Sequence, residues 1–401
     1  MYLAASIPLS RNALTIETTP VTAPLPPVLP SAEPVAAPPY VAPSGSVRFP
    51  LGWMLRNGSP PLQYRATMEV ARLFDAPPPS VAALPLHGRT ALLLAASQSL
   101  DGGWSRSMLS VPAAPGSIEG VGLIVGFRRL LESGWDKDAP PLARARRLLF
   151  RLLAEDEDPN YLYEYSPQAT DDTMVRYGRR VLREAAAAVL AQAGYEADPR
   201  LRGAARRILD RLVDYFRSPL SQKPWTRIGN KHVLAADAMP PSIFTIAMLA
   251  HMPLFRSELN DVVERLYQHL VLSMPRQEPV QLIGEHMIDQ PYLILGDPLH
   301  SRHVFDSDPG FGFVWLELMA RLGFLRRHEG WSVLFERLLD QRDSDGVWRV
   351  AKGETALRSA HPMGWSAFPL QENLEGEGRF TDATFRIGLI ARLSGRTIDL
   401  T

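Results

Sequence analysis

The densest group of residues capable of acid–base or metal chemistry lies between residues 285 and 308. Three of the chain's nine histidines and five carboxylates fall there. Glycines and prolines interrupt the segment, which indicates an extended loop or a broken helix. Loops carried by a rigid scaffold are where binding and catalytic groups usually sit. The group comprises Glu285, His286, Asp289, Asp297, His300, Arg302, His303, Asp306 and Asp308.

Two kinds of chemistry fit this segment. His300 and His303 could offer imidazoles to a divalent metal together with Asp306, and such a metal is the one cofactor that the sequence suggests. In a metal-free site, His303 could instead pair with Asp306 or Asp308 as acid and base. The plainer interpretation is loop polarity, because Asp306-Ser-Asp308-Pro-Gly precedes an apolar stretch and has the composition of a turn and helix cap. Both interpretations stay open.

Two smaller polar groups offer alternatives. Asp171 and Asp172 are adjacent carboxylates, which can split their pKa values or share a divalent metal with a diphosphate, and we include both among the catalytic candidates. They also precede a long helical pattern, which favours an N-terminal cap. The stretch 227–232 (RIGNKH), followed by Asp237, could neutralise and deprotonate an acidic sugar. Its plainer interpretation is a polar connector before the next helix.

The elements that must position these groups are helices. After residue 50, apolar residues recur mostly at intervals of three and four, with few strictly alternating windows. The segments 120–131, 242–250 and 312–322 are apolar over most of their circumference, which is typical of helices enclosed by protein. The pattern predicts helices near 62–74, 88–98, 119–133, 140–154, 171–193, 199–217, 241–252, 257–273, 280–294, 310–323, 328–341 and 381–394.

Enclosed and amphipathic helices alternate over much of this order. Such an order predicts an inner ring of enclosed helices and an outer ring of half-exposed ones, joined as helical hairpins. Six hairpins would close an all-α, α/α toroid of the (α6/α6) type. An open α-solenoid has a similar periodicity and stays an alternative.

Composition excludes several classes of protein. The chain has 401 residues and no cysteine, so it has no disulfide framework, thiolate nucleophile or cysteine-dependent metal site. Forty-three basic residues balance forty-three acidic ones, which removes the positive field that a nucleic-acid binder needs, so we expect no nucleic-acid partner.

The N-terminal segment differs from the rest. Nine of the 36 prolines lie between Pro20 and Pro43. We therefore expect residues 1–48 to be a disordered, proline-rich tail that could recruit a protein partner, and 49–401 to form a single domain. No sustained apolar run indicates a secretory signal or a membrane span, which favours a cytoplasmic protein, with peripheral membrane contact as a further option.

Two turns share an unusual construction. Each follows an apolar helix and carries Gln, Asp, Gly and Trp in the same order, at 98–104 (QSLDGGW) and 341–348 (QRDSDGVW). Gly breaks the helix and permits positive φ, Asp accepts hydrogen bonds from free backbone N–H groups, and Trp folds back onto the helices. These are devices that fasten one hairpin to the next, and the residues that do so would be Gln98, Asp101, Gly102, Trp104, Gln341, Asp345, Gly346 and Trp348.

The pattern resembles the QW repeat of the terpenoid cyclase and prenyltransferase toroids, including squalene–hopene cyclases and the β subunits of protein prenyltransferases. The resemblance covers residues 60 to 400 in architecture and implies an apolar, isoprenoid-type substrate with cyclase, isomerase or transferase chemistry. The chain departs from these families at their reactive groups. It has no Asp-x-Asp-Asp run, Val175 stands where Asp-Asp-x-x-Asp would need its last Asp, and the zinc-binding Cys is missing.

Three classes of function therefore stand side by side. The first is an isoprenoid-handling enzyme with an aromatic-walled apolar cavity, the second a polysaccharide lyase or hydrolase on the same fold, and the third a non-catalytic toroid that serves as a binding module. Aromatic residues near expected loops and inner-helix starts could line the cavity: Trp53, Tyr161, Tyr163, Tyr165, Trp225, Tyr292, Phe305, Phe311, Phe313, Trp315, Trp365 and Phe368.

Overall fold

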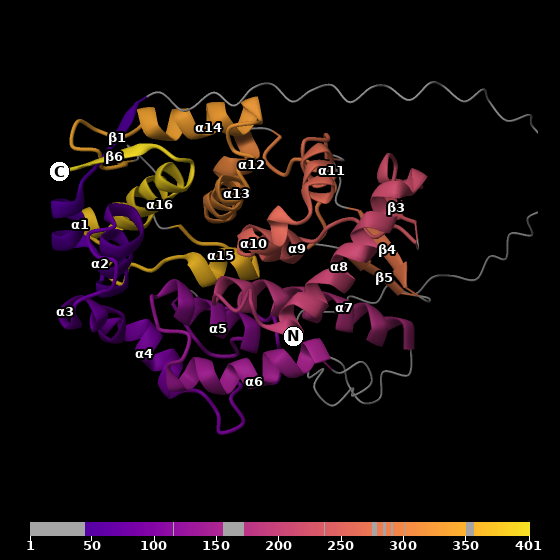
Figure 1. The fold of residues 1–401 in the computed structure, drawn as a ribbon, viewed down its shortest axis with the longest axis horizontal. Helices are drawn as coiled ribbons and strands as arrows, with labels where there is room; N and C mark the ends of the chain where they lie inside the picture. The colour runs from indigo at the N-terminus through magenta and orange to yellow at the C-terminus, as the bar shows by residue number, and fades with distance from the viewer. Residues whose placement is uncertain are drawn as a thin grey trace, which may run out of the picture. The chain divides into compact units, whose positions relative to one another are not determined.

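The computed structural model describes residues 45–114, 116–154, 172–235, 237–274, 279–283, 286–289, 292–300, 302–349 and 357–401, with backbone only at 154, 172–176, 283, 286 and 302–304. The chain divides into two units, Met1–Pro39 and Tyr40–Thr401, and all described residues belong to the second. This unit is mostly α-helical (Figure 1).

Helices enclosed by the rest of the protein form the centre of the unit. Every residue of α9 is buried, and burial runs without a break from Thr381 to Ala391 in α16. Such burial suits sequences that are apolar around most of the helix. The enclosed helices are α5 (Leu123–Glu132), α7 (Asp172–Gln192), α9 (Ile243–Ala250), α13 (Pro309–Arg321), α15 (Pro362–Ala367) and α16 (Thr381–Leu393).

Amphipathic helices cover this centre. The long helix α8 buries one stripe, seven residues in nineteen, and exposes arginines and carboxylates on the opposite face, whereas α4 exposes Leu92 and Leu93 and α3 buries no residue. The larger ones are α4 (Arg89–Ala96), α6 (Pro140–Ala154), α8 (Pro199–Arg217), α11 (Asn260–Leu270) and α14 (Glu329–Asp340). The shorter ones are α1 (Leu51–Asn57), α2 (Pro60–Arg65), α3 (Pro79–Ala82), α10 (Pro253–Ser257) and α12 (Arg302–Ser307).

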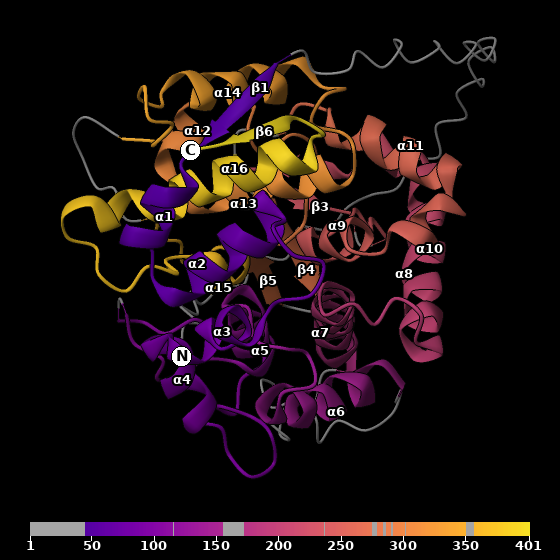
Figure 2. The same ribbon diagram turned by 60° about the vertical axis from the view of Figure 1, so that its left-hand side comes forward.

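The enclosed helices contact one another in sequence order. α5 packs on α7, α7 on α9, α9 on α13 and α13 on α16, and α16 packs on α2 and on the π-helical turn η1 (Ala66–Ala71) that follows it. α15 lies between α5 and α13 and contacts both (Figure 2). The short helix α15 therefore bridges α5 and α13.

Two small sheets complete the unit. β1 (Ser46–Phe49) pairs in parallel with β6 (Thr397–Leu400), with Val47 opposite Ile398. The second sheet has the order β2-β3-β4-β5 and is formed by β2 (Trp225–Ile228), β3 (Lys231–Leu234), β4 (Val280–Ile283) and β5 (His286–Asp289). Its two hairpins are antiparallel, and β3 joins β4 in parallel through Val233 and Val280.

The sheets correct three expectations. The predicted helix 280–294 is wrong, because Val280 to Asp289 forms the β4–β5 hairpin, in which β-branched and apolar residues flank a Gly-Glu pair. The stretch 227–232 is a β-hairpin rather than a helix-capping connector. β1 takes in residues 46–48, which the sequence assigned to the tail.

The two Gln-Asp-Gly-Trp turns have the predicted glycine conformation, and Asp101 accepts from the Gly103 N–H as expected, but in the second turn Asp343 takes the role assigned to Asp345 and accepts from the Asp345 and Val347 N–H groups. Gly102 and Gly346 have φ of +95° and +87°, the left-handed region that glycine tolerates. In the first turn, the Gln98 side chain donates to the carbonyl oxygen of Pro141 at 2.8 Å and Trp104 Nε1 donates to that of Leu94 at 2.6 Å. In the second, the Trp348 side chain is buried and its Nε1 lies 3.4 Å from Gln341 Oε1.

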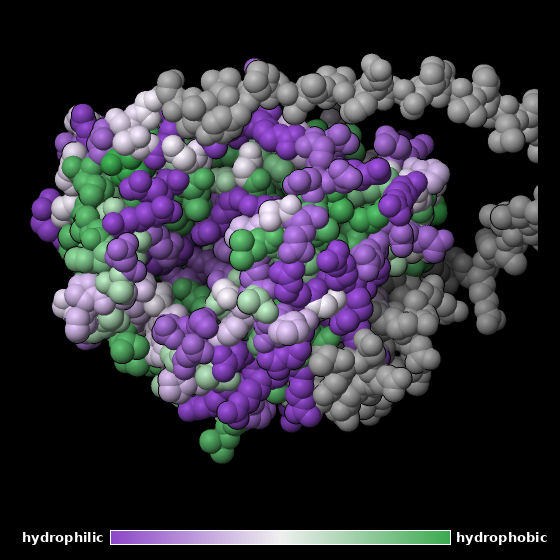
Figure 3. Space-filling model, viewed as in Figure 1, coloured by the Kyte–Doolittle hydropathy of each residue, from purple (hydrophilic) through white to green (hydrophobic). Residues whose placement is uncertain are grey.

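The surface is largely hydrophilic on the face shown in Figure 3. That face is hollowed near its middle, between the segments labelled α10 and α16 in Figure 1, and both hydrophilic and hydrophobic residues lie at the rim of the hollow. Among the described residues, none of the helices combines the length and the apolar character needed to cross a membrane.

Candidate ligand pocket and buried ion cluster

The predicted segment 285–308 does not form one site in the part that the structure describes. Asp306 is on α12, its side chain is 51% exposed, and its carboxylate lies 4.0 Å from Arg337 Nη2. His300 is exposed, with its Nδ1 3.2 Å from the carbonyl oxygen of Asp297. His303 lies on α12, and its side chain is outside the described atoms.

Asp308 has the structural role of a helix cap. Its carboxylate accepts hydrogen bonds from the Phe311 N–H at 2.8 Å, at the start of α13, and from the Ser359 hydroxyl at 2.7 Å. Both oxygens are therefore used to begin α13 and to hold the segment before α15. Asp306 and Asp308 are close in sequence but serve different helices.

The other predicted groups are also placed apart. Asp171 lies outside the described residues, and Asp172 begins α7 with its side chain outside them. Within the described part of the chain, no three His, Asp or Glu side chains gather as metal ligands would. Among the aromatic residues expected to line a cavity, Tyr292 lines a pocket, whereas Phe305, Phe313, Trp315 and Phe368 are buried in the core. Tyr161, Tyr163 and Tyr165 lie outside the residues that the structure describes.

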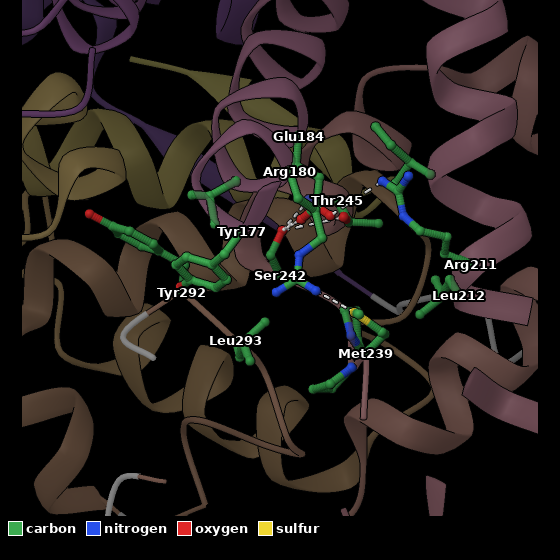
Figure 4. Close-up of a pocket in the computed structure, with 14 residues that line it drawn as sticks. Tyr177, Arg180, Glu184, Arg211, Leu212, Met239, Ser242, Thr245, Tyr292 and Leu293 are labelled. Atoms are coloured by element: carbon green, nitrogen blue, oxygen red, sulfur yellow. Dashed lines mark hydrogen bonds and ion pairs between the residues drawn. The ribbon is translucent and has the colours of Figure 1, made fainter. Parts of the chain in front are cut away.

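A pocket opens between α7, α8 and the segment that leads into α9 (Figure 4). The enclosed space is only about 20 Å³, room for one or two water molecules, so the pocket is a shallow, partly open hollow on the surface between these elements. We call it the α7–α9 pocket. Most of its wall is apolar, formed by Val181, Ile208, Leu212, Met239, Pro240, Pro241 and Leu293.

The polar groups of the α7–α9 pocket come from three elements. α7 supplies Arg180 and Glu184, α8 supplies Arg211, and Ser242 is the N-cap of α9. The Ser242 hydroxyl donates to Glu184 Oε2 at 2.6 Å and accepts from the Thr245 N–H at 3.1 Å. Arg211 Nη2 lies 3.9 Å from Glu184 Oε1.

The arginines carry more charge than the pocket neutralises. Arg180 contacts the Met239 sulfur and lies 5.2 Å from the centre of the Tyr177 ring, and neither contact cancels its charge. Burial lowers the pKa of Arg211, which Glu184 opposes and Arg180 reinforces. Two guanidinium groups therefore face one carboxylate on an apolar wall. Such a site can hold an anionic group attached to an apolar body.

A second charged group is buried among the enclosed helices. We call it the buried ion cluster: Arg65, Arg128, Glu132, Glu317, Arg321 and Arg386. Glu132, the last residue of α5, accepts from Arg65 at 2.5 Å, Arg386 at 2.6 Å and Arg128 at 3.1 Å. Gln192 at the end of α7 adds a fourth hydrogen bond to Glu132 at 2.7 Å.

Ion pairing in this cluster outweighs the cost of burial. Burial alone would raise the pKa of Glu317, but Arg386 and then Arg321 lower it to about 2. The pKa of Glu132 is likewise well below its usual value, because Arg386, Arg65 and Arg128 outweigh its burial. The carboxylates therefore stay ionised and fully paired. The carboxylates of the cluster are saturated and join helices, whereas the arginines outnumber them and Arg386 Nε has no hydrogen-bond partner within the described part of the chain.

Two histidines lie in the field of the cluster. Burial and then the charge of Arg321 lower the pKa of His251 to about 3, and burial and then Arg128 lower that of His361 to about 4. Both imidazoles are neutral at pH 7. His361 Nδ1 accepts from the Met363 N–H at 3.2 Å, so its proton is on Nε2. The His361 ring contacts those of Phe311 and Tyr292, and Tyr292 also lines the α7–α9 pocket.

Neither the polar residues of the α7–α9 pocket nor the buried ion cluster was predicted from the sequence, although the sequence holds one indication of the cluster. Glu317 is a single carboxylate within the apolar stretch 312–322, and Arg128 and Arg129 interrupt another enclosed helix. A charge inside an enclosed helix has to find a partner, because an unpaired buried charge is too costly. Arg128–Glu132 and Glu317–Arg321 are pairs four residues apart on one helix, which spacing could indicate. The ion pairs that join different helices are 67 to 254 residues apart, and spacing gives no indication of those.

Comparison of the chain with family models, with curated proteins and with solved structures found no match.

Proposed function

We propose that the chain is a closed α/α toroid that binds an apolar, isoprenoid-type ligand through an acidic head group held in the α7–α9 pocket. Closure is supported by the chain of contacts from α5 through α7, α9 and α13 to α16, by the packing of α16 on α2, and by the Arg65–Glu132 bond between α2 and α5. The pairing of β1 with β6 adds a further link.

One observation carries the ligand assignment. Glu184 is the one carboxylate among the residues that line the pocket, it lies near Arg211, and the wall beside the two arginines is apolar. A neutral hydrocarbon such as squalene would leave these guanidinium groups desolvated without compensation. An isoprenoid acid or phosphate would pair with them while its chain covers Ile208, Leu212 and Leu293. The proposal concerns binding and includes no chemical step.

A second candidate rests on the Tyr177 ring, which lies beside Arg180. A tyrosine next to an arginine is the arrangement that a uronic-acid lyase uses to remove a proton beside a carboxylate. His361 would not be the base, because its acceptor nitrogen is already engaged by the Met363 N–H. The hypothesis therefore requires Tyr177 to act alone, and the apolar wall favours the isoprenoid ligand over a sugar.

Calorimetric titration of the full chain tests these alternatives. The probes are farnesyl diphosphate, squalene in detergent and an oligogalacturonate. We expect binding of the first and a loss of at least tenfold in affinity for Arg180→Met and for Arg211→Met. Arg202→Met, on the same helix as Arg211 but outside the pocket, is the matched control and should bind as the wild type does. Binding of squalene or of the oligogalacturonate alone would overturn the isoprenoid-anion assignment.

A further inference from the structure

Glu184 is an acidic residue in a pocket that we assign to an acidic ligand. Its side chain is 11% exposed and lines the α7–α9 pocket between the two arginines (Figure 4). The Ser242 hydroxyl holds one carboxylate oxygen, and Arg211 lies near the other. A carboxylate fixed in this way repels every anion that enters the pocket.

The charges around Glu184 define what the pocket can accept. Among the residues that line the pocket, Arg180 and Arg211 counted against Glu184 leave one positive charge, and Arg207 and Asp210, which act on Arg211 with opposite signs, offset each other. A ligand with a single negative charge neutralises the site. Each further negative charge meets the Glu184 carboxylate at short range, where the repulsion is strong because the surroundings are partly desolvated.

We propose that Glu184 is a specificity-determining residue that makes the pocket prefer an isoprenoid carboxylate to an isoprenoid phosphate or diphosphate. The inference rests on the function proposed above and names the head group. Ser242 is a positioning residue in this scheme, since its hydroxyl is the donor that fixes Glu184 Oε2.

Three probes with the same hydrocarbon chain test the inference: farnesoic acid, farnesyl monophosphate and farnesyl diphosphate, titrated into the full chain without divalent metal. We expect the wild type to bind the carboxylate at least tenfold more tightly than the diphosphate. Glu184→Gln keeps an acceptor for Ser242 and removes the charge, so it should gain at least tenfold in affinity for the diphosphate and less for the carboxylate.

Glu329→Gln is the matched control. Glu329 is an exposed residue of α14 that does not line the pocket, and its replacement changes the net charge of the protein by the same amount. It should leave the affinity ratio unchanged. Ser242→Ala should reduce the preference for the carboxylate, because Glu184 would lose its fixed position.

The results of these titrations distinguish a failure of the Glu184 inference from a failure of the proposed function. If the wild type prefers the diphosphate, or if Glu184→Gln and Glu329→Gln shift the ratio equally, the role of Glu184 is refuted while the pocket assignment stands. If none of the three probes binds, the proposed function is refuted and the inference with it.

Discussion

The buried ion cluster and the α7–α9 pocket place arginine beside glutamate in opposite ways. In the cluster, Glu132 accepts four hydrogen bonds and Arg386 bridges it to Glu317. In the pocket, Glu184 accepts a hydrogen bond from the Ser242 hydroxyl, and Arg180 contacts no carboxylate within the described residues. Glutamates whose oxygens are all used by arginines and Gln192 therefore hold helices together, whereas an arginine at a surface pocket without a carboxylate partner can receive a ligand.

The largest expected effect is on the cluster. Arg386→Met leaves the Glu132 and Glu317 carboxylates buried with a partner missing, so the free energy of unfolding should fall by about 3 to 5 kcal/mol. Urea denaturation followed by circular dichroism measures it. Arg202→Met is the control, because the Arg202–Glu258 pair is 34% and 47% exposed and should cost less than about 1 kcal/mol. Equal losses would remove the distinction between saturated and surface pairs.

The pH dependence of stability tests the neutral histidines that link the two regions. Native His361 has a pKa of about 4 against 6.5 when exposed, so the unfolded chain binds more protons between these values. Stability should therefore be fully present above pH 6.5 and should be lost progressively as the pH falls to 4, by about 1 to 2 kcal/mol for this partly exposed ring. His251 acts in the same direction.

His361→Asn keeps a side-chain cap at the start of α15 and removes the titration. Its unfolding free energy, measured by urea denaturation at pH 7 and at pH 4.5, should change less between the two pH values than that of the wild type. An unchanged slope would mean that His361 is not held neutral by burial and Arg128.

A smaller loss is expected at the helix starts. Asp308→Ala removes the side-chain acceptor for the Phe311 N–H, so the unfolding free energy should fall by about 1 kcal/mol. Asp306→Asn, on the exposed side of α12, should change it by less than about 0.5 kcal/mol. The reverse order in thermal denaturation would restore Asp306 as a residue of interest.

The smallest effect on stability should come from the pocket itself. Arg180→Met removes a charge that no carboxylate among the described residues pairs with, so the unfolding free energy should stay within about 0.5 kcal/mol of the wild type. A loss comparable to that of Arg386→Met would show that Arg180 is a structural residue, and the contrast between the two regions would fail.

Long periodic helices were predictable from local pattern alone. The predicted helices 140–154 and 199–217 agree with α6 and α8 at both ends. Each begins with a proline, a residue favoured in the first turn, and each keeps an apolar stripe along its length. The strands within 280–294 were not predictable from local pattern, because β4 depends on pairing with β3, which lies nearly fifty residues earlier in the chain.

The residues of the α7–α9 pocket were harder to predict from the sequence than the helices. Arg180, Arg211 and Ser242 come from three elements and look like ordinary surface or capping residues in the sequence. Histidine-rich segments attract attention because their residue types suggest chemistry, but in the structure Asp308 caps a helix and His300 faces solvent. Convergence of side chains is a property of packing, which spacing along the chain does not encode.

The parallel pairing of β1 with β6 has a consequence for folding. It joins Val47 to Ile398 across 351 residues, so forming it early would close a very long loop for only a few hydrogen bonds. These strands should therefore associate after the helices between them have packed, and a pair of fluorescent probes at the two positions would report the completion of the whole unit.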